Sequence, residues 1–121
     1  MNKGKKVSGG KYNKRRKKKL HERPGQKRIV KLGDEKGKRK RVSGGVLKDF
    51  MLKVKFINVK TKEKDKGKKM EIKNVIETPS NRFLARQNVI TKGTIVETEI
   101  GKVRVTNRPS QESIANGILL E

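Results

Sequence analysis

From Phe50 onward the chain alternates apolar and polar residues with the period of a β-strand. The first such run covers residues 50–56, where the even-numbered positions are Phe50, Leu52, Val54 and Phe56. A helix would instead need apolar residues three and four positions apart. We expect a charged turn at residues 61–69 and a second strand at residues 70–78. In that second strand Ile72 and Ile76 share one face, and Val75 lies out of phase.

Shorter strands are expected in quick succession towards the C-terminus. They cover residues 88–91, 94–99, 102–106 and 118–120, and the inward positions of the middle two are Val96, Thr98, Val103 and Val105. Turns at residues 78–81 and 107–110 separate them, with Phe83 and Leu84 packed beneath the first turn and one helical turn at residues 111–116. This pattern predicts an all-β fold, a small closed β-barrel of about six strands, because closure leaves no exposed strand edge.

The N-terminal part of the chain lacks this pattern and is strongly basic. Its apolar residues are isolated before Val46, and residues 1–48 hold 20 Lys and Arg against three acids, whereas residues 49–121 hold 15 against nine. Dense like charges repel one another and keep a chain open. We therefore divide the chain into a long basic arm at residues 1–45, largely extended and disordered when free, and a β-barrel domain at residues 46–121.

Composition excludes several kinds of functional site and structural link from this chain. It has no Cys, one His and only 30% apolar residues in 121, with a net charge of +23. Thiolate zinc sites, cysteine nucleophiles and disulfides are therefore excluded, and we expect neither a metal nor a cofactor. No stretch approaches the roughly 18 apolar residues of a membrane span, so no membrane partner is expected.

The segments that resemble catalytic motifs lack residues or spacings that those motifs require. The segment at residues 33–39 has three residues between its glycines rather than the four of a phosphate-binding loop, and Arg39 stands where Ser or Thr binds magnesium. His21 has no nucleophile beside it, and Glu97 and Glu99 fit a solvated strand face. We expect a protein that is not an enzyme and has no small-molecule substrate.

The basic runs point to a polyanion as partner, because almost no carboxylates interleave to neutralise them. An irregular folded RNA is favoured over duplex DNA, since no recognition helix, zinc finger or leucine zipper is present and a flexible arm can order on RNA. The candidate RNA-binding residues are basic positions of the arm and four at turns or outer strand faces of the barrel: Lys11, Lys14, Arg15, Arg16, Lys17, Lys18, Lys19, Arg23, Lys27, Arg28, Lys31, Lys38, Arg39, Lys40, Arg41, Arg86, Lys92, Arg104 and Arg108.

Several segments resemble one known family. They are residues 86–93 (RQNVITKG), 101–111 (GKVRVTNRPSQ), 116–119 (NGIL), 8–11 (SGGK) and 19–24 (KLHERP). Together they resemble the eukaryotic-type small-subunit ribosomal protein eight of archaea and eukaryotes, at the length of an archaeal member. The chain departs from the family at residues 46–51, where more basic residues are usual, and at Ser110, where Gly is common.

That resemblance implies a structural constituent of the small ribosomal subunit, located in the cytoplasm. Its partners would be small-subunit ribosomal RNA and neighbouring ribosomal proteins, and its fold a six-stranded barrel with a basic N-terminal arm. Three alternatives stay open: a ribosome-assembly factor with the same barrel, a basic DNA-architectural protein and a small RNA-modifying enzyme. The second would bind duplex DNA about as well as RNA, and the third would need a cofactor loop or a catalytic cluster.

Overall fold

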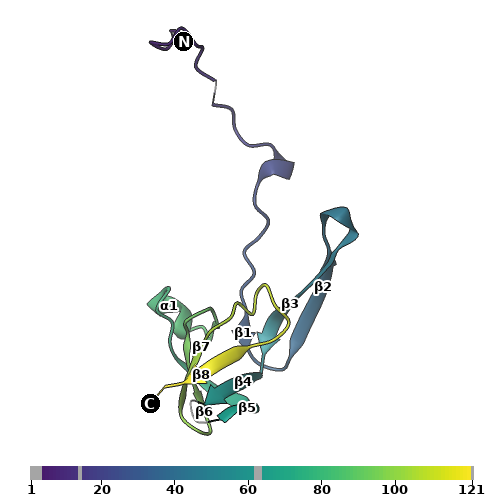
Figure 1. Ribbon diagram of the computed structural model, residues 1–121, viewed down its shortest axis with the longest axis vertical. Coiled ribbons are helices and arrows are strands. Elements are labelled where there is room, and N and C mark those ends of the chain that lie inside the picture. Colours follow the sequence, from purple (N-terminus) through teal and green to yellow (C-terminus); the bar gives the residue numbers. More distant parts are fainter. Residues whose placement is uncertain (1–3, 14, 62–63, 121) are drawn as a thin grey trace.

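The computed structural model describes residues 4–13, 15–61 and 64–120, and most of its regular structure is β-strand (Figure 1). Helical structure is limited in this part of the chain to α1 (Arg82–Ala85) and to 3-10 turns at Leu20–Glu22 and Ser43–Gly45. No helix among the described residues has the length and apolar character needed to cross a membrane.

Five strands close into a barrel. In barrel order they are β4 (Phe56–Thr61), β5 (Lys64–Glu77), β6 (Ile95–Thr98), β7 (Lys102–Val105) and β8 (Asn116–Leu119). Neighbouring strands are antiparallel, except that β8 closes the barrel by pairing in parallel with β4. The expectation of a closed barrel is confirmed, with five strands in it where about six were expected.

A separate three-stranded sheet precedes the barrel. It has the order β1-β3-β2 and consists of β1 (Lys31–Leu32), β2 (Lys36–Arg41) and β3 (Leu47–Val54). The expectation of a single strand at residues 50–56 is wrong, because Lys55 separates β3 from β4. The positions whose side chains face the core also change from even to odd numbers there. Val54 is buried before the break, and Ile57 and Val59 are buried after it.

The sheet that residues 31–54 form spans the proposed division at residue 45, so residues of the basic segment take part in folded structure. Val30 is only 1% exposed and belongs to the hydrophobic core. The Ile90 N–H donates to the Val30 carbonyl at 2.9 Å, and the Leu32 N–H donates to the Asn88 carbonyl at 2.9 Å. Residues 88–91 are therefore not the expected strand: they form one isolated bridge, between Lys31 and Val89.

Strand β5 contains a bulge that reverses its inward face. The pairing with β6 shifts register between Ile72 and Asn74, where the Asn74 Oδ1 accepts a hydrogen bond from the Val75 N–H at 2.9 Å. An extra residue in a strand moves all later side chains to the opposite face. Consequently Val75 is buried and Ile76 is 42% exposed, which is the reverse of the sequence expectation.

Of the remaining expectations, the two middle strands are confirmed and three others are wrong. Strands β6 and β7 are confirmed, with Val96, Thr98, Val103 and Val105 buried. The turn expected at residues 61–69 is mostly strand, because β5 already begins at Lys64, and its residues 62 and 63 lie outside the described residues. Residues 111–116 form no helix. Phe83, expected to pack beneath a turn, is 58% exposed.

Residues 4–13 and 15–29 lie outside both sheets. Their side chains are exposed, and Figure 1 shows this segment running away from the barrel. Its local structure consists of the 3-10 turn at Leu20–Glu22 and a bridge between Lys5 and Lys11.

Closure of the barrel depends on Gly117 in β8. A Cβ at this position would lie 2.5 Å from Val103 Cγ1, 2.9 Å from Ile57 Cδ1 and 3.0 Å from the Arg104 carbonyl oxygen. Only a residue without a side chain lets β8 approach both β4 and β7 this closely.

The bulge in β5 predicts opposite effects for two neighbouring substitutions. Val75→Asp should lower the free energy of unfolding by at least about 3 kcal/mol, because it buries an unpaired charge. Ile76→Asp places the same charge on the outer face and should change it by less than about 1 kcal/mol. Urea denaturation followed by circular dichroism measures both. The reverse order of effects would show that the strand keeps its alternation through residue 76.

The closing strand predicts that Gly117→Ala destabilises the barrel by about 1–3 kcal/mol, since a methyl group must be forced between packed atoms. The matched control is Gly67→Ala, also in a barrel strand, where the nearest atom to a new Cβ is the Val59 carbonyl oxygen at 3.8 Å. Thermal and urea unfolding of both variants should separate them, and equal stability would disprove the role of Gly117.

Candidate nucleic-acid interface

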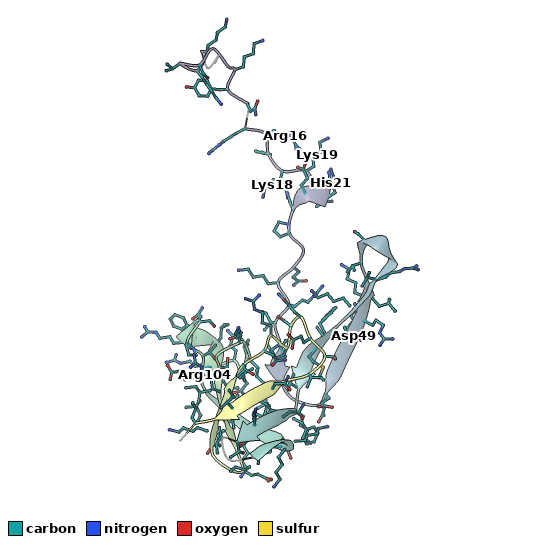
Figure 2. All side chains as sticks on the ribbon, viewed as in Figure 1. Arg16, Lys18, Lys19, His21, Asp49 and Arg104 are labelled. Carbon is teal, nitrogen blue, oxygen red and sulfur yellow. The ribbon has the colours of Figure 1, made fainter. Side chains whose placement is uncertain are left out.

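The exposed segment before Val30 carries the first group of candidate RNA-binding residues. Figure 2 shows Arg16, Lys18, Lys19 and His21 on it, away from the barrel. Lys14 lies outside the described residues. The other candidates in this segment all have exposed side chains: Lys11, Arg15, Arg16, Lys17, Lys18, Lys19, Arg23, Lys27 and Arg28.

A short ion-paired turn organises the middle of this segment. Arg16 donates two hydrogen bonds to the Glu22 carboxylate, at 2.8 Å and 2.5 Å, and the Lys19 N–H donates to the same carboxylate at 2.9 Å. Arg16, and next the Lys19 amide, lower the pKa of Glu22. The charge of Arg16 is thereby partly neutralised within the protein, although its side chain is exposed like those of Lys17 and Lys18.

The hairpin of β2 and β3 presents the second group, Lys38, Arg39, Lys40 and Arg41. All four side chains are exposed. Arg39 forms a two-point ion pair with Asp49 across the hairpin, at 2.6 Å and 3.0 Å, and hydrogen bonding from Arg39 lowers the pKa of Asp49.

Like charges lie opposite one another on the same hairpin. Lys40 pairs in register with Lys48, and Lys36 pairs with Lys53. Directly opposed like charges destabilise an antiparallel pair of strands. An anion bound between such residues relieves the repulsion, so the hairpin favours a polyanionic partner.

Arg28 and Lys31 lie where the exposed segment joins the folded part. The Arg28 guanidinium stacks over the Phe50 ring at 3.8 Å from its centroid, which holds the cation on the surface of the small sheet. Lys31 is exposed in β1, where it pairs with Lys53 of β3. Of the predicted basic residues before Lys36, Lys31 thus starts from a paired strand, and Arg28 is held by its side-chain contact with Phe50.

A groove brings together four of the predicted residues from distant parts of the sequence. Lys27 and Arg28 lie on one side, and Lys92 and Arg108 come from two turns of the barrel domain. Arg104 lies on the outer face of β7 (Figure 2), and Arg86 caps the C-terminal end of α1.

Sequence reasoning missed an exposed aromatic residue next to Arg86. Arg82, Phe83 and Arg86 line one small hollow, and the Arg82 guanidinium lies 5.5 Å from the centroid of the Phe83 ring. An exposed ring between arginines is a stacking platform for an unpaired base. In the sequence, Asn81 could have indicated a helix start, because Asn is a common N-cap residue. In the structure its Oδ1 caps α1 by accepting a hydrogen bond from the Phe83 N–H. A helix beginning there turns Phe83 outward.

No group of three His, Asp or Glu residues within the described residues is placed to hold a metal ion. The described surface offers cationic side chains, the exposed rings of Phe83 and Tyr12 and a cation-lined groove.

Comparisons with a family model and with individual proteins point to the same family. A family model described as ribosomal protein S8e matches residues 1–120. The small ribosomal subunit protein eS8 of Staphylothermus marinus is 44% identical over 117 residues, covering 96% of this chain and 91% of the relative. The proteins of the same name from Pyrobaculum aerophilum and Sulfolobus acidocaldarius are 43% and 38% identical, covering 97% and 98% of this chain and 91% and 94% of the relatives. The chain belongs to the ribosomal protein S8e family.

Proposed function

We propose that this protein is a structural constituent of the small ribosomal subunit, in the cytoplasm, and that it binds small-subunit ribosomal RNA. The observation that carries the proposal is the exposure of the basic side chains at residues 15–29 and 38–41, outside the hydrophobic core. Exposed cations outside the core are available to neutralise phosphates. The names of the relatives supply the ribosomal setting.

In this proposal three basic surfaces act together. The part of the arm before Val30 orders among the phosphates of a folded RNA, and the β2–β3 hairpin offers its opposed lysines. The remaining surface is basic residues after the hairpin: Arg86, Lys92, Arg104 and Arg108. Ordering an arm costs conformational entropy, which many simultaneous phosphate contacts can offset. Neighbouring ribosomal proteins are the other partners, and neither a cofactor nor a small-molecule substrate belongs to this function.

Irregular RNA fits these surfaces better than duplex DNA. An exposed ring between two arginines suits an unpaired base, which a regular duplex does not present. A competition assay between small-subunit ribosomal RNA and duplex DNA separates the proposal from a DNA-architectural role, which predicts equal binding. Stable presence in mature small subunits separates it from a role limited to assembly.

Deleting residues 1–26 should weaken binding to small-subunit ribosomal RNA by orders of magnitude at about 0.15 M salt. This segment holds 11 Lys and Arg and one acid. The loss of these cations should also make the salt dependence shallower. The melting temperature should change little, because the deletion keeps Val30 and both sheets. Filter binding over a salt series and calorimetry provide the measurements.

The control for the deletion keeps the chain length and replaces the six basic residues at positions 14–19 by Gln. It should show the same direction of change in affinity and salt slope, in proportion to the charge removed. If both variants bind as tightly as the unmodified protein, recognition lies in the barrel and hairpin and this account of the arm is wrong.

Asp49→Asn should tighten RNA binding several-fold, because it frees Arg39 for phosphate. Arg39 holds the pKa of Asp49 low, so at neutral pH the substitution removes a full negative charge. We expect the salt slope to steepen by up to about 0.7–0.9, the value for one added phosphate contact. Little stability should be lost, since exposed ion pairs contribute little.

The matched control is Asp34→Asn, an equal change of charge at an exposed residue between β1 and β2. It should produce a smaller gain in affinity. Weaker binding by Asp49→Asn would show instead that the Arg39–Asp49 ion pair shapes the hairpin for RNA.

A further inference from the structure

The groove between the arm and the barrel domain has a volume of about 480 Å³, within the range of small-ligand sites, about 300–1,000 Å³. Four segments of the chain form its walls: residues 27–30, 80–84, 89–92 and 108–110. It therefore exists only when the base of the arm, α1 and two turns come together.

The lining divides into an apolar part and a cationic part. Apolar side chains come from Ile29, Val30, Leu84, Val89, Ile90 and Pro109. Lys27, Arg28, Lys92 and Arg108 contribute exposed positive groups. Among the described residues that line the groove, none is acidic.

Hydrogen bonds fix the walls of the groove before any ligand arrives. The Ile90 N–H donates to the Val30 carbonyl at 2.9 Å, and the Met51 N–H donates to the Pro109 carbonyl at 3.0 Å. The hydroxyls of Ser80 and Thr91 lie 3.3 Å apart, within hydrogen-bond distance. A site held in this way loses little conformational freedom when it binds.

Resting on the proposed function, we propose that this groove receives one unstacked nucleotide of the ribosomal RNA. The planar base lies against the apolar wall, and its flanking phosphates contact Lys92, Arg108 and Lys27. A nucleotide combines an apolar face with adjacent negative charge, which matches both parts of the lining. An apolar peptide would leave the cations unmatched.

Polar groups in the wall are suited to the edge of a base. The Asn81 Oδ1 already accepts the hydrogen bond that caps α1, which leaves the NH₂ group of the same amide as a donor. The Thr91 hydroxyl is shared with Ser80 and with the Thr94 hydroxyl, 3.1 Å away. These groups offer a donor and an acceptor close to the apolar wall.

The test is photo-crosslinking of the full-length protein to an archaeal small-subunit ribosomal RNA transcript that contains 4-thiouridine, followed by mass spectrometry. We expect single-nucleotide adducts on peptides that contain residues 27–30, 89–92 or 108–110. The same search is repeated in assembled small subunits. Adducts that spare all three of these segments, such as adducts confined to residues 1–26, would overturn the proposal.

A pair of variants tests the contribution to affinity. Ser110→Phe fills the groove from its half-buried wall position, and Gln111→Phe adds the same ring one residue further on, outside the groove. We expect Ser110→Phe to lose the groove adducts and to bind about tenfold more weakly, as for loss of one stacked base. Its salt slope should change little, since the substitution leaves all the cations of the groove in place. Gln111→Phe should behave like the unmodified protein.

The outcomes distinguish the two proposals. If the unmodified protein prefers ribosomal RNA with a steep salt dependence, but gives no groove adducts and is unaffected by Ser110→Phe, the groove proposal fails and the proposed function stands. If it shows no preference for ribosomal RNA over duplex DNA, the proposed function fails. Should Ser110→Phe lower the melting temperature, the adducts of the unmodified protein decide the question alone.

Discussion

The close approach of β8 to β4 and β7 is the constraint on which this fold depends. Gly117 lies against Val103 and Ile57 with no room for a side chain, so the last strand can complete the barrel. Parallel pairing of β4 with β8 then joins segments 58 residues apart, such as Asn58 and Asn116. A small core gives only modest stability, and closure concentrates its apolar side chains in one place.

The fold separates the residues that pack in the core from the exposed cations that are proposed to bind RNA. Its core consists of uncharged side chains, almost all of them aliphatic, and the cations lie on the exposed segment, the hairpin and the turns. The two roles meet at the base of the arm. There Val30 enters the core, and two residues earlier Arg28 stacks on Phe50. The end of the core is thus also the beginning of the proposed RNA-binding surface.

Sequence patterns predicted the elements that depend on short-range alternation. The strands around Val96 and Val103 were expected and are present, and the basic residues of the arm were assigned to the surface where they lie. The break at Lys55 and the bulge at Asn74 were not foreseen. The bulge lies in the pairing of β5 with β6, and the break lies where the chain passes from the three-stranded sheet into the barrel. Each reverses which side chains face the core.

Composition and alternation predicted the class of the molecule, an all-β fold with a large excess of cations, and from that excess a polyanion is the expected partner. Composition and alternation are local properties, and both can be read without knowing which strands pair. Only the tertiary structure decided that five strands close the barrel and that Lys27, Lys92 and Arg108 surround one apolar groove. Those outcomes depend on packing and hydrogen bonds between segments up to 83 residues apart, from residue 27 to residue 110. The period of a single strand carries no information about such contacts.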